Sequence, residues 1–446
     1  MKLKLIAAAA VLCAVGALIP LSFMLVRRGT VPAPESSGIG RQAEKAEKSG
    51  WSRWRGRDGN GISYESGWDT EFAAKPVRLN WKVNIGEGFS NVSVTDEYVY
   101  TMGYDKVSSK NIIYCLKRKT GETLWRHAYR TYPSIDGHHG PRSTPVLDED
   151  RLYTFGQNGE ILCNNAVTGE FIWNLYNKFS APNPSRELGA SPYLHGGLVV
   201  VNAFRSGMAV NKDTGKTIWK SGGNDGNNST PAAYRHKGEK RLALFGQHYL
   251  YGIKPENGKT VWSYPWPSSS GVNAADPAAY GEEKLFVSSG DSTGCALLDL
   301  SGGKPAVLWR NKNLSAHVAS PVIIGDFVYG IDGNAGRDAR LTCLDLRDGS
   351  IRWTSGKTGC GNFIAADGYI IMISETGNLL VAEARPDRFS LIGMQKKVLP
   401  PICLTAPVLY ASTLYLRNSR GDLISVDISK NNSAAPLNTG AVSYLY

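Results

Sequence analysis

Seven tryptophans recur along this chain of 446 residues at nearly constant intervals of 44, 48, 46, 43, 47 and 44 residues. A Thr-Gly or Asp-Gly pair stands shortly before several of them, as in residues 164–173 (NNAVTGEFIW). Glycine between apolar runs indicates a hairpin, because it supplies the left-handed backbone that the turn needs. The period predicts a stack of similar structural units. The recurring tryptophans are Trp81, Trp125, Trp173, Trp219, Trp262, Trp309 and Trp353.

A second periodic mark is a small residue two positions before a proline, followed by an apolar stretch. Proline is tolerated at the start of a strand or at a sheet edge, which fits the innermost strand of a propeller blade. Six copies contain the proline, and residues 91–93 and 362–364 are two further copies without it. Eight innermost strands therefore predict an all-β, eight-bladed β-propeller of four-stranded antiparallel blades. The six prolines are Pro145, Pro192, Pro231, Pro277, Pro321 and Pro407.

One unit shows all four strands clearly, at residues 145–147, 152–155, 160–164 and 170–174. The last unit, residues 407–427, has room for only three strands. We expect Leu79–Val83 to supply its fourth strand, which would close the ring and leave no exposed sheet edge at the seam. A tryptophan at the same phase of each unit is explained best by packing between blades, because one buried indole removes about 150–250 Å² from water.

The N-terminus carries an uncharged segment, residues 5–26, with Lys2 and Lys4 before it and Arg27 and Arg28 after it. Twenty-two uncharged, mostly apolar residues in one helix are long enough to cross a bilayer. We expect an uncleaved signal anchor in residues 1–28, a flexible linker in residues 29–50 and the propeller in residues 51–446. A cleaved signal peptide with a soluble exported body is the first alternative. The opposite orientation, with the body in the cytosol, also stays open.

Charge and cysteine content exclude several classes of function. The net charge is +11, but no long run of Lys or Arg occurs after the N-terminal segment, so no nucleic-acid partner is expected. None of the seven cysteines forms a CxxC pair or a Cys/His metal pattern, and no metal site is predicted. Three of them, Cys115, Cys163 and Cys343, share one phase of the repeat and are expected to be small core residues.

The Asp/Asn-x-x-Thr-Gly-x-x-x-Trp repeat resembles the pyrroloquinoline-quinone (PQQ) type of propeller repeat. Quinoprotein alcohol dehydrogenases and BamB-type outer-membrane assembly propellers share that repeat. The segments 51–59 (WSRWRGRDG) and 139–145 (HGPRSTP) are similar to a group of exported bacterial PQQ-like propellers. The resemblance covers about Trp51 to Asp427. It implies the fold strongly and the function weakly, because one fold hosts many roles.

The resemblance also implies what an enzyme of this kind would need. Quinoprotein dehydrogenases use two adjacent cysteines over the quinone, a tryptophan beneath it, a calcium ion held by Glu and Asn, and an Asp base. No two cysteines are adjacent here, and no Cys-x-x-Cys-His occurs. We therefore expect no cofactor and no catalytic residue. The expected function is a non-catalytic binding or scaffold propeller, similar to BamB, on the periplasmic side of the inner membrane. Its expected partners are envelope proteins, and residues 5–26 are its expected membrane anchor.

Two other functions stay open on the sequence alone. One is a PQQ- and calcium-dependent, alcohol dehydrogenase-like oxidoreductase. The other is a sensor of a small ligand or carbohydrate that binds in the central channel.

The mouth of that channel is the expected ligand site, because one set of residues from each blade lines it as the innermost strands begin. Arg142, Asp276 and His317 together would suit a polar or anionic group. The competing interpretation is that such side chains bond to neighbouring strand ends and to channel water. The candidates are Asn91, Arg142, Ser191, Ser229, Asn273, Asp276, His317 and Asn362.

Three further motifs are interpreted as loops. His138-His139 lacks nearby metal-binding partners, and residues 148–150 (DED) are expected to form a solvated turn. The glycine-rich residues 222–226 lie between strands and begin no helix, so they lack the setting of a phosphate loop.

Overall fold

A computed structural model of the protein describes residues 50–132, 139–176 and 188–430. All of the described residues belong to one compact unit of the chain. The predicted anchor at residues 5–26 and the linker up to residue 49 lie outside the described residues. In the part of the chain that is described, no helix is long and apolar enough to span a bilayer.

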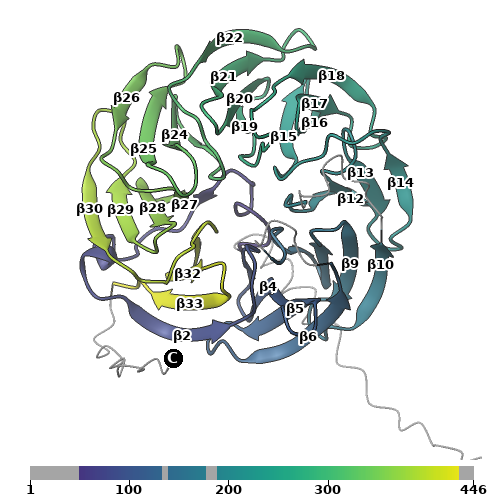
Figure 1. Ribbon diagram of the computed structural model, residues 1–446, viewed down its shortest axis with the longest axis vertical. Helices are drawn as coiled ribbons and strands as arrows, with labels where there is room; N and C mark the ends of the chain where they lie inside the picture. The colour runs from purple at the N-terminus through teal and green to yellow at the C-terminus, as the bar shows by residue number, and fades with distance from the viewer. Residues whose placement is uncertain (1–49, 133–138, 177–187, 431–446) are drawn as a thin grey trace, which may run out of the picture. The chain divides into compact units, whose positions relative to one another are not determined.

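The described residues form eight β-sheets that are arranged in a ring, as Figure 1 shows. This confirms the predicted eight-bladed propeller. Blade 1 contains β3 (Ser93–Val94), β4 (Tyr98–Asp105), β5 (Lys110–Lys117) and β6 (Thr123–Arg130). Blade 2 contains β7 (Val146–Asp148), β8 (Arg151–Phe155), β9 (Glu160–Asn165) and β10 (Phe171–Tyr176). Blade 3 contains β11 (Tyr193–His195), β12 (Leu198–Val201), β13 (Met208–Asn211) and β14 (Thr217–Lys220). Blade 4 contains β15 (Ala232–His236), β16 (Glu239–Phe245), β17 (Tyr249–Ile253) and β18 (Thr260–Pro265).

The second half of the ring repeats this plan and adds two short elements from the N-terminal side. Blade 5 contains β19 (Ala278–Tyr280), β20 (Lys284–Ser289), β21 (Gly294–Asp299) and β22 (Ala306–Asn311). Blade 6 contains β23 (Val322–Ile324), β24 (Phe327–Asp332), β25 (Arg340–Asp345) and β26 (Ile351–Thr354). Blade 7 contains β27 (Gly361–Ala366), β28 (Tyr369–Ser374), β29 (Leu379–Glu383) and β30 (Leu391–Gln395), with β1 (Ile62–Ser63) added in parallel to its inner edge. Blade 8 contains β31 (Val408–Tyr410), β32 (Thr413–Arg417), β33 (Asp422–Asp427) and β2 (Arg78–Asn84). The 3-10 helix η1 (Phe72–Ala74) lies between β1 and β2 in the chain.

The ring closes through β2, as predicted for residues 79–83. This strand is antiparallel to β33, with Leu79 opposite Val426 and Val83 opposite Leu423. Figure 1 shows the purple N-terminal strand beside the yellow C-terminal one. Arg417 of β32 joins blade 8 to blade 1: its side chain is buried and donates to the carbonyls of Ser90 and Met102 at 2.5 and 2.7 Å. Burial lowers the pKa of Arg417 to about 9, so the guanidinium stays charged at neutral pH.

The recurring tryptophans lie between neighbouring blades. Trp81 of blade 8 donates its indole N–H to the carbonyl of Arg118 on blade 1, and its ring lies against Gly121 in the turn before β6. A side chain at position 121 would collide with the indole of Trp81, so the turn requires glycine where the indole packs on it. Trp262 is the exception and donates to the Tyr234 hydroxyl of its own blade. The same indole-to-carbonyl contact is made by Trp125, Trp173, Trp219, Trp309 and Trp353.

Blade 7 has a glycine where the other blades have tryptophan. Gly393 of β30 faces Val381 in the register that Trp353 and Cys343 occupy in blade 6. A Cβ atom at Gly393 would lie 2.6 Å from the backbone nitrogen of Ala74, so η1 covers this position instead of an indole. Trp68 packs on η1, with its ring 6.2 Å from that of Phe72 and 5.6 Å from that of Tyr369.

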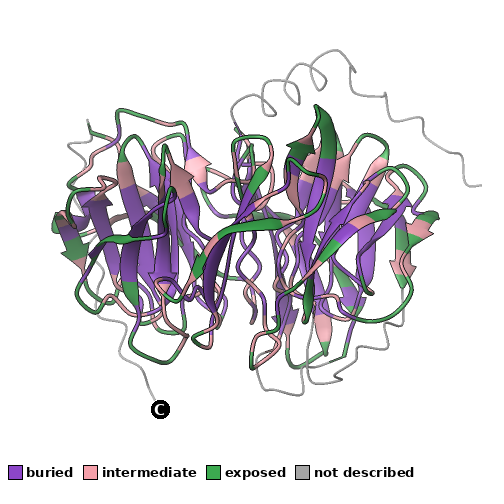
Figure 2. Ribbon diagram, turned by 90° about the horizontal axis from the view of Figure 1, so that it is seen from above, coloured by how far each residue is buried: buried purple, intermediate pink, exposed green. Residues whose placement is uncertain are grey.

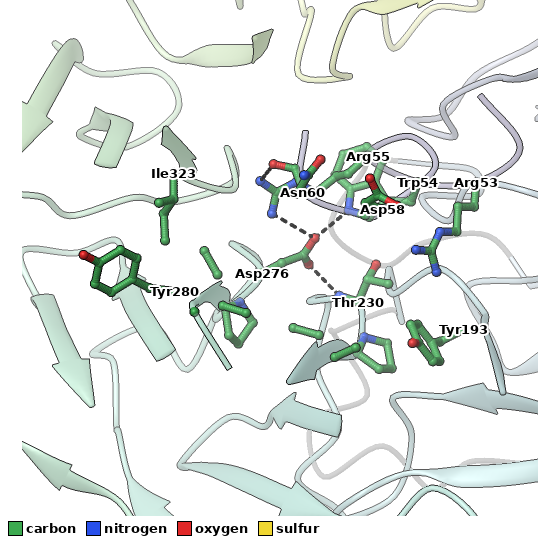
Figure 3. Close-up of a pocket in the computed structure, with 18 of the residues that line it drawn as sticks. Arg53, Trp54, Arg55, Asp58, Asn60, Tyr193, Thr230, Asp276, Tyr280 and Ile323 are labelled. Carbon is green, nitrogen blue, oxygen red and sulfur yellow. Dashed lines mark hydrogen bonds and ion pairs between the residues drawn. The ribbon is translucent and has the colours of Figure 1, made fainter. Parts of the chain in front are cut away.

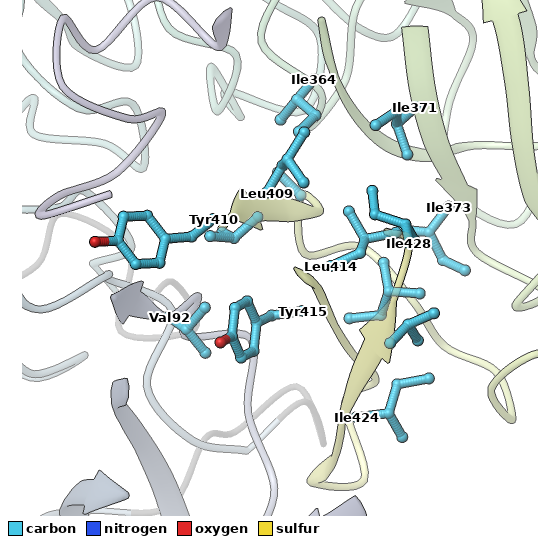
Figure 4. Packing of buried hydrophobic residues seen from close by; sticks show 14 of the residues in the cluster. Val92, Ile364, Ile371, Ile373, Leu409, Tyr410, Leu414, Tyr415, Ile424 and Ile428 are labelled. Atoms are coloured by element: carbon cyan, nitrogen blue, oxygen red, sulfur yellow. The ribbon is translucent and has the colours of Figure 1, made fainter. Parts of the chain in front are cut away.

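The hydrophobic core consists of side chains from the strands of the blades. Figure 2 shows buried residues along the strand interiors and exposed ones at loops and outer edges. The largest apolar cluster among the described residues spans blades 7, 8 and 1. Ile371 and Ile373 lie on the same side as Leu414, whereas Tyr415 lies beside Val92 (Figure 4). The six described cysteines are all buried and unpaired, including Cys115, Cys163 and Cys343 in the third strands of their blades.

Candidate functional site: a divided central channel

The ring has two ends that differ in the connections they carry. We call the end where each blade's fourth strand joins the next blade's first strand the crossover face. We call the opposite end, where first and second strands join in hairpins, the hairpin face. Each innermost strand runs from the crossover face to the hairpin face, because the strands within a blade alternate in direction.

Residues 51–63, which we call the arm, lie across the hairpin end of the channel. The arm begins on blade 1, where Trp51 forms a two-way backbone bridge with Val94. It passes blade 2, where the amide of Leu147 donates to the carbonyl of Ser52 at 3.0 Å. It ends on blade 7 as β1, beside Ala365. The purple segment that crosses the centre of the ring in Figure 1 is this arm.

Trp54 and Arg55 fix the arm to the far side of the channel. The indole nitrogen of Trp54 lies 2.6 Å from the carboxylate of Asp276, and the amide of Thr230 donates to the same carboxylate at 2.6 Å. Arg55 lies 3.8 Å from Asp276 and donates to the carbonyl of Pro321 at 2.5 Å. Burial raises the pKa of Asp276 and lowers the pKa of Arg55, while the attraction between the two charges opposes both changes.

The arm therefore divides the channel into two chambers that share Trp54, Thr230 and Asp276 as a wall. The crossover chamber has a volume of about 610 Å³ and opens at the crossover face. Its polar lining includes Arg142, Ser191, Asn228, His317, Asn362 and Glu375, and its apolar lining includes Phe89, Val272, Val318, Ile402 and Leu404.

The hairpin chamber has a volume of about 380 Å³ and lies under the arm, against blades 3 to 6. Figure 3 shows Asp276 at its centre, with Arg53 and Tyr193 on one side and Tyr280 and Ile323 on the other. The remaining wall is made mostly of small or rigid residues, namely Pro192, Pro231, Ala232, Ala233, Pro277, Ala278, Ala279, Gly281 and Gly325.

The structure brings together five of the eight candidate residues of the channel mouth. Arg142, Ser191, Asp276, His317 and Asn362 all line the crossover chamber. These residues come from blades 2, 3, 5, 6 and 7, so the chamber is a composite of most of the ring.

The other three candidates lie inside the channel wall. Asn273 donates to the carbonyl of Gly246 at 2.7 Å and accepts a bond from the Ser289 hydroxyl at 2.6 Å. Asn91 accepts the amide of Val92, and Ser229 is fully buried. Asn273 and Ser229, which donates to the carbonyl of Phe245 at 3.5 Å, thus bond to neighbouring strand ends, as in the competing interpretation made from the sequence, whereas Asn91 bonds to the next residue of the chain.

His317 is the titratable base of the crossover chamber. Its Nδ1 atom lies 3.4 Å from the backbone nitrogen of Ala335. Burial lowers the pKa of His317, and the carboxylates of Asp291 and Glu375 act in the opposite direction. We expect a neutral imidazole at neutral pH, able to exchange hydrogen bonds with a polar ligand.

The polar side chains that line the crossover chamber do not fit a calcium ion and a quinone. The carboxylate of Asp276 is engaged by Trp54, Thr230 and Arg55, and Glu375 accepts the amide of Gly336 at 2.7 Å. In the described ranges, no three His, Cys, Asp or Glu side chains lie close enough together to hold a metal ion. The residues that the resemblance would require are therefore not assembled here, and we derive no redox step.

The motifs interpreted as loops have local partners. Asp148 pairs with Lys212 at 2.6 Å, and Asp150 accepts a bond from Asn165 at the β7–β8 turn. In the glycine-rich segment, Asp225 binds the ring nitrogen of His248 at 2.7 Å. His138 lies outside the described residues, and the ring of His139 lies 5.7 Å from that of Tyr104.

Sequence reasoning missed Trp54 and Arg55, which help to divide the channel, and Glu375, which lines the crossover chamber. These three residues belong to no repeat position, so periodicity gives them no role. The available signal was the pair Trp51 and Trp54, which stands before the first repeat and out of phase with it.

The fold and the channel define this chain as an eight-bladed propeller in which tryptophans pack between neighbouring blades. This is the type of propeller found in quinoproteins and in BamB. A family model described as "Outer membrane protein assembly factor BamB" matches residues 109–355, more than half of the chain. The chain belongs to this family.

The individual relatives are distant. Outer membrane protein assembly factor BamB of Burkholderia pseudomallei (strain K96243) is 25% identical, over 57% of this chain and 75% of that protein. The protein of the same name from Salmonella typhimurium is 24% identical, over 68% of this chain and 78% of that protein.

Solved structures agree on the fold. BamB from Moraxella catarrhalis superposes with a TM-score of 0.59 at 14% identity, over 79% of this chain and 99% of that one. Quinohemoprotein alcohol dehydrogenase from Comamonas testosteroni gives 0.64 at 12% identity, over 90% and 84%. At these identities the likeness concerns the fold alone.

Proposed function

We propose that this chain is a non-catalytic binding propeller of the cell envelope that contacts a protein partner through its crossover face. Family membership supports this proposal, because the curated relatives are named as assembly factors for outer membrane proteins. The donor set of the channel also favours binding over redox chemistry. The proposal includes an exported body held on the periplasmic side of the membrane by residues 5–26.

The observation that carries the proposal is the placement of exposed apolar side chains. Val107 in the β4–β5 turn is 97% exposed, Tyr132 after β6 is 77% exposed, and Tyr176 at the end of β10 is 53% exposed. The strand directions place all three on the crossover face of blades 1 and 2. We call them the blade 1–2 patch. Exposed apolar side chains grouped on one face of a soluble domain mark interaction sites.

Capture from membranes tests the proposal. The full-length chain carrying an affinity tag is crosslinked in its own host, and the adducts are purified after membrane solubilisation. The expected result is an envelope protein that is enriched by the unaltered chain and lost with Val107→Asp plus Tyr132→Ser. Equal recovery by both chains, with equal melting temperatures, would contradict the proposed surface.

The enzyme alternative has its own assay. The purified chain is incubated with PQQ and calcium, and dye-linked oxidation of alcohols is followed. We expect no turnover above that of heat-denatured protein, because the donor set is not assembled. Clear turnover would replace the scaffold proposal with an oxidoreductase.

A second candidate function rests on the crossover chamber. Its volume of about 610 Å³ lies within the range of small-ligand sites, and Arg142, His317 and Asn362 place polar groups among apolar walls. A thermal-shift screen against sugars and metabolites tests whether the chain is a sensor. The sensor function requires a compound that raises the melting temperature of the unaltered chain and does not raise that of His317→Gln.

A further inference from the structure

Arg53 is held in one position at the edge of the hairpin chamber. Its Nε atom donates to the carbonyl of Arg57 at 3.0 Å, and its guanidinium carbon lies 5.5 Å from the centre of the Tyr193 ring. A guanidinium fixed through one nitrogen and one stacked face still has its terminal N–H groups to offer. Across the described part of the chain, no carboxylate lies within ion-pairing distance of Arg53.

The other charges of the chamber have counter-charges. Arg55 is paired with Asp276 at 3.8 Å. Asp58 lies at the rim, where it accepts a bond from the Tyr64 hydroxyl at 2.7 Å and lies 3.5 Å from the guanidinium of Arg57. Arg53 is therefore the lining charge that has no balancing partner among the residues described, and it gives the chamber a local preference for an anion.

The wall facing this charge is largely apolar. Pro192, Pro231, Ala232 and Ala278 lie along the inner strands, and Ile323 and Tyr280 stand on the side opposite Arg53 (Figure 3). Tyr280 donates its hydroxyl to Asp326 at 2.6 Å, so this polar tip is already engaged. One guanidinium and a mostly apolar wall suit a ligand with one carboxylate and an apolar body.

We propose that the hairpin chamber is a binding site for an apolar carboxylate, whose anionic group pairs with Arg53 and whose body rests on the proline and alanine wall. The volume of about 380 Å³ fits a ligand of the size of one bulky amino acid. Either a free carboxylic acid or the C-terminal residue of a peptide carries this chemistry. The proposal does not depend on the proposed function, because the chamber lies on the face opposite the blade 1–2 patch.

A ligand-detected NMR titration of the full-length chain tests the proposal. The probes are N-acetyl-L-phenylalanine and its amide, which differ in the carboxylate. We expect the acid to bind at least about tenfold more tightly than the amide, since a charge-assisted bidentate pair is the strong contact. Equal binding of acid and amide, or no saturable binding of the acid up to about 10 mM, would overturn the proposal.

Two variants locate the site. Arg53→Gln removes the proposed partner and should lower the affinity for the acid about tenfold, to that of the amide. Arg235→Gln removes one positive charge at the hairpin end of blade 4, but Arg235 does not line the chamber and donates to the carbonyl of Gly238, so its effect should stay below about twofold. An equal loss in both variants would overturn the assignment of Arg53. The comparison of acid and amide on the unaltered chain stands even if Arg53→Gln disturbs the arm.

A third probe distinguishes the two sources of the carboxylate. The peptide Ala-Ala-Phe, with a free C-terminus, is titrated beside N-acetyl-L-phenylalanine. Tighter binding of the tripeptide supports a peptide end as the ligand, and tighter binding of the single residue supports a free acid. Loss of the tripeptide signal when its C-terminus is amidated is expected in both cases, and its persistence would contradict the role of Arg53.

Discussion

The indole nitrogen of Trp54 lies 2.6 Å from the carboxylate of Asp276, although 222 residues separate them in the chain. This bond joins the arm to the start of β19 and forms part of the wall between the two chambers. The arm is thus attached at both of its ends and in its middle, to blade 1 through Trp51, to blade 7 through Ile62 and to blade 5 through Trp54.

Replacing Trp54 by phenylalanine should lower the free energy of unfolding by about 1.5–3 kcal/mol more than the same change at Trp51. Trp54 donates to a buried carboxylate, and a hydrogen bond to a charged group contributes about 1.5–3 kcal/mol. The buried indole nitrogen of Trp51 has no hydrogen-bond partner among the described residues. Both changes remove the same atoms, so Trp51→Phe is the matched control. Chemical denaturation of the two variants measures the difference, and equal losses would show that the bond to Asp276 contributes nothing.

The buried pair of Arg55 and Asp276 should behave as one unit. Either Asp276→Asn or Arg55→Met leaves the partner charge buried without compensation, and each should cost about 3–5 kcal/mol. The double variant should cost clearly less than the sum, because no isolated charge remains. A double-mutant cycle from denaturation curves measures this coupling, and additive losses would mean that the two charges do not interact.

The fit between turn glycines and tryptophans predicts a graded response to alanine. Gly215 has φ +68°, and a Cβ atom there would lie 2.5 Å from the ring of Trp173. Gly238 has a similar φ of +77° with nothing within 4 Å, so Gly238→Ala reports the backbone strain alone. We expect Gly215→Ala to lower stability by at least about 1 kcal/mol more than Gly238→Ala. Equal melting temperatures of the two variants would refute the docking of the indole on the turn.

His317 should make the native state less stable as the pH falls below neutrality. Burial lowers its pKa below the ordinary value of 6.5, so the unfolded chain takes up a proton before the native chain does. This contribution is complete above pH 6.5 and is lost progressively towards the lower native pKa. His317→Gln should therefore show a smaller loss of stability than the unaltered chain between pH 7.5 and about pH 5.5. If the free energy of unfolding changes equally with pH in the unaltered chain and in His317→Gln, the imidazole is not shielded from protonation.

The sequence predicted those features of the fold that repeat. Trp125 and Trp173 mark the same place in successive blades, so their spacing reveals the unit length, and the missing last strand points to Leu79–Val83. A glycine at position 393 breaks the pattern, and nothing near it in the sequence shows that η1 covers it. Periodicity also cannot distinguish side chains that face the channel from those that turn into the wall, as Asn273 does.

The candidate site was predicted only in part, for a related reason. Arg142, Asp276 and His317 were expected together because each stands at or near the start of an innermost strand, and they do line one chamber. The arm contributes to the channel wall through single long-range contacts, such as that of Arg55 with Pro321. Such contacts produce no periodic spacing or unusual composition from which they could be predicted. Arg53 is likewise recognisable as a ligand candidate only when the pairing of its neighbours is known.

Photo-crosslinking in living cells tests most directly whether the crossover face binds a protein. A photoreactive amino acid is placed at Val107 in one strain and at Tyr64 in another. Tyr64 is 63% exposed and follows β1 on the hairpin face, so it is an exposed control on the opposite face. The account predicts a discrete adduct with an envelope protein from position 107 and none from position 64. Adducts of equal yield from both positions, or none from position 107, would contradict a binding role for this face.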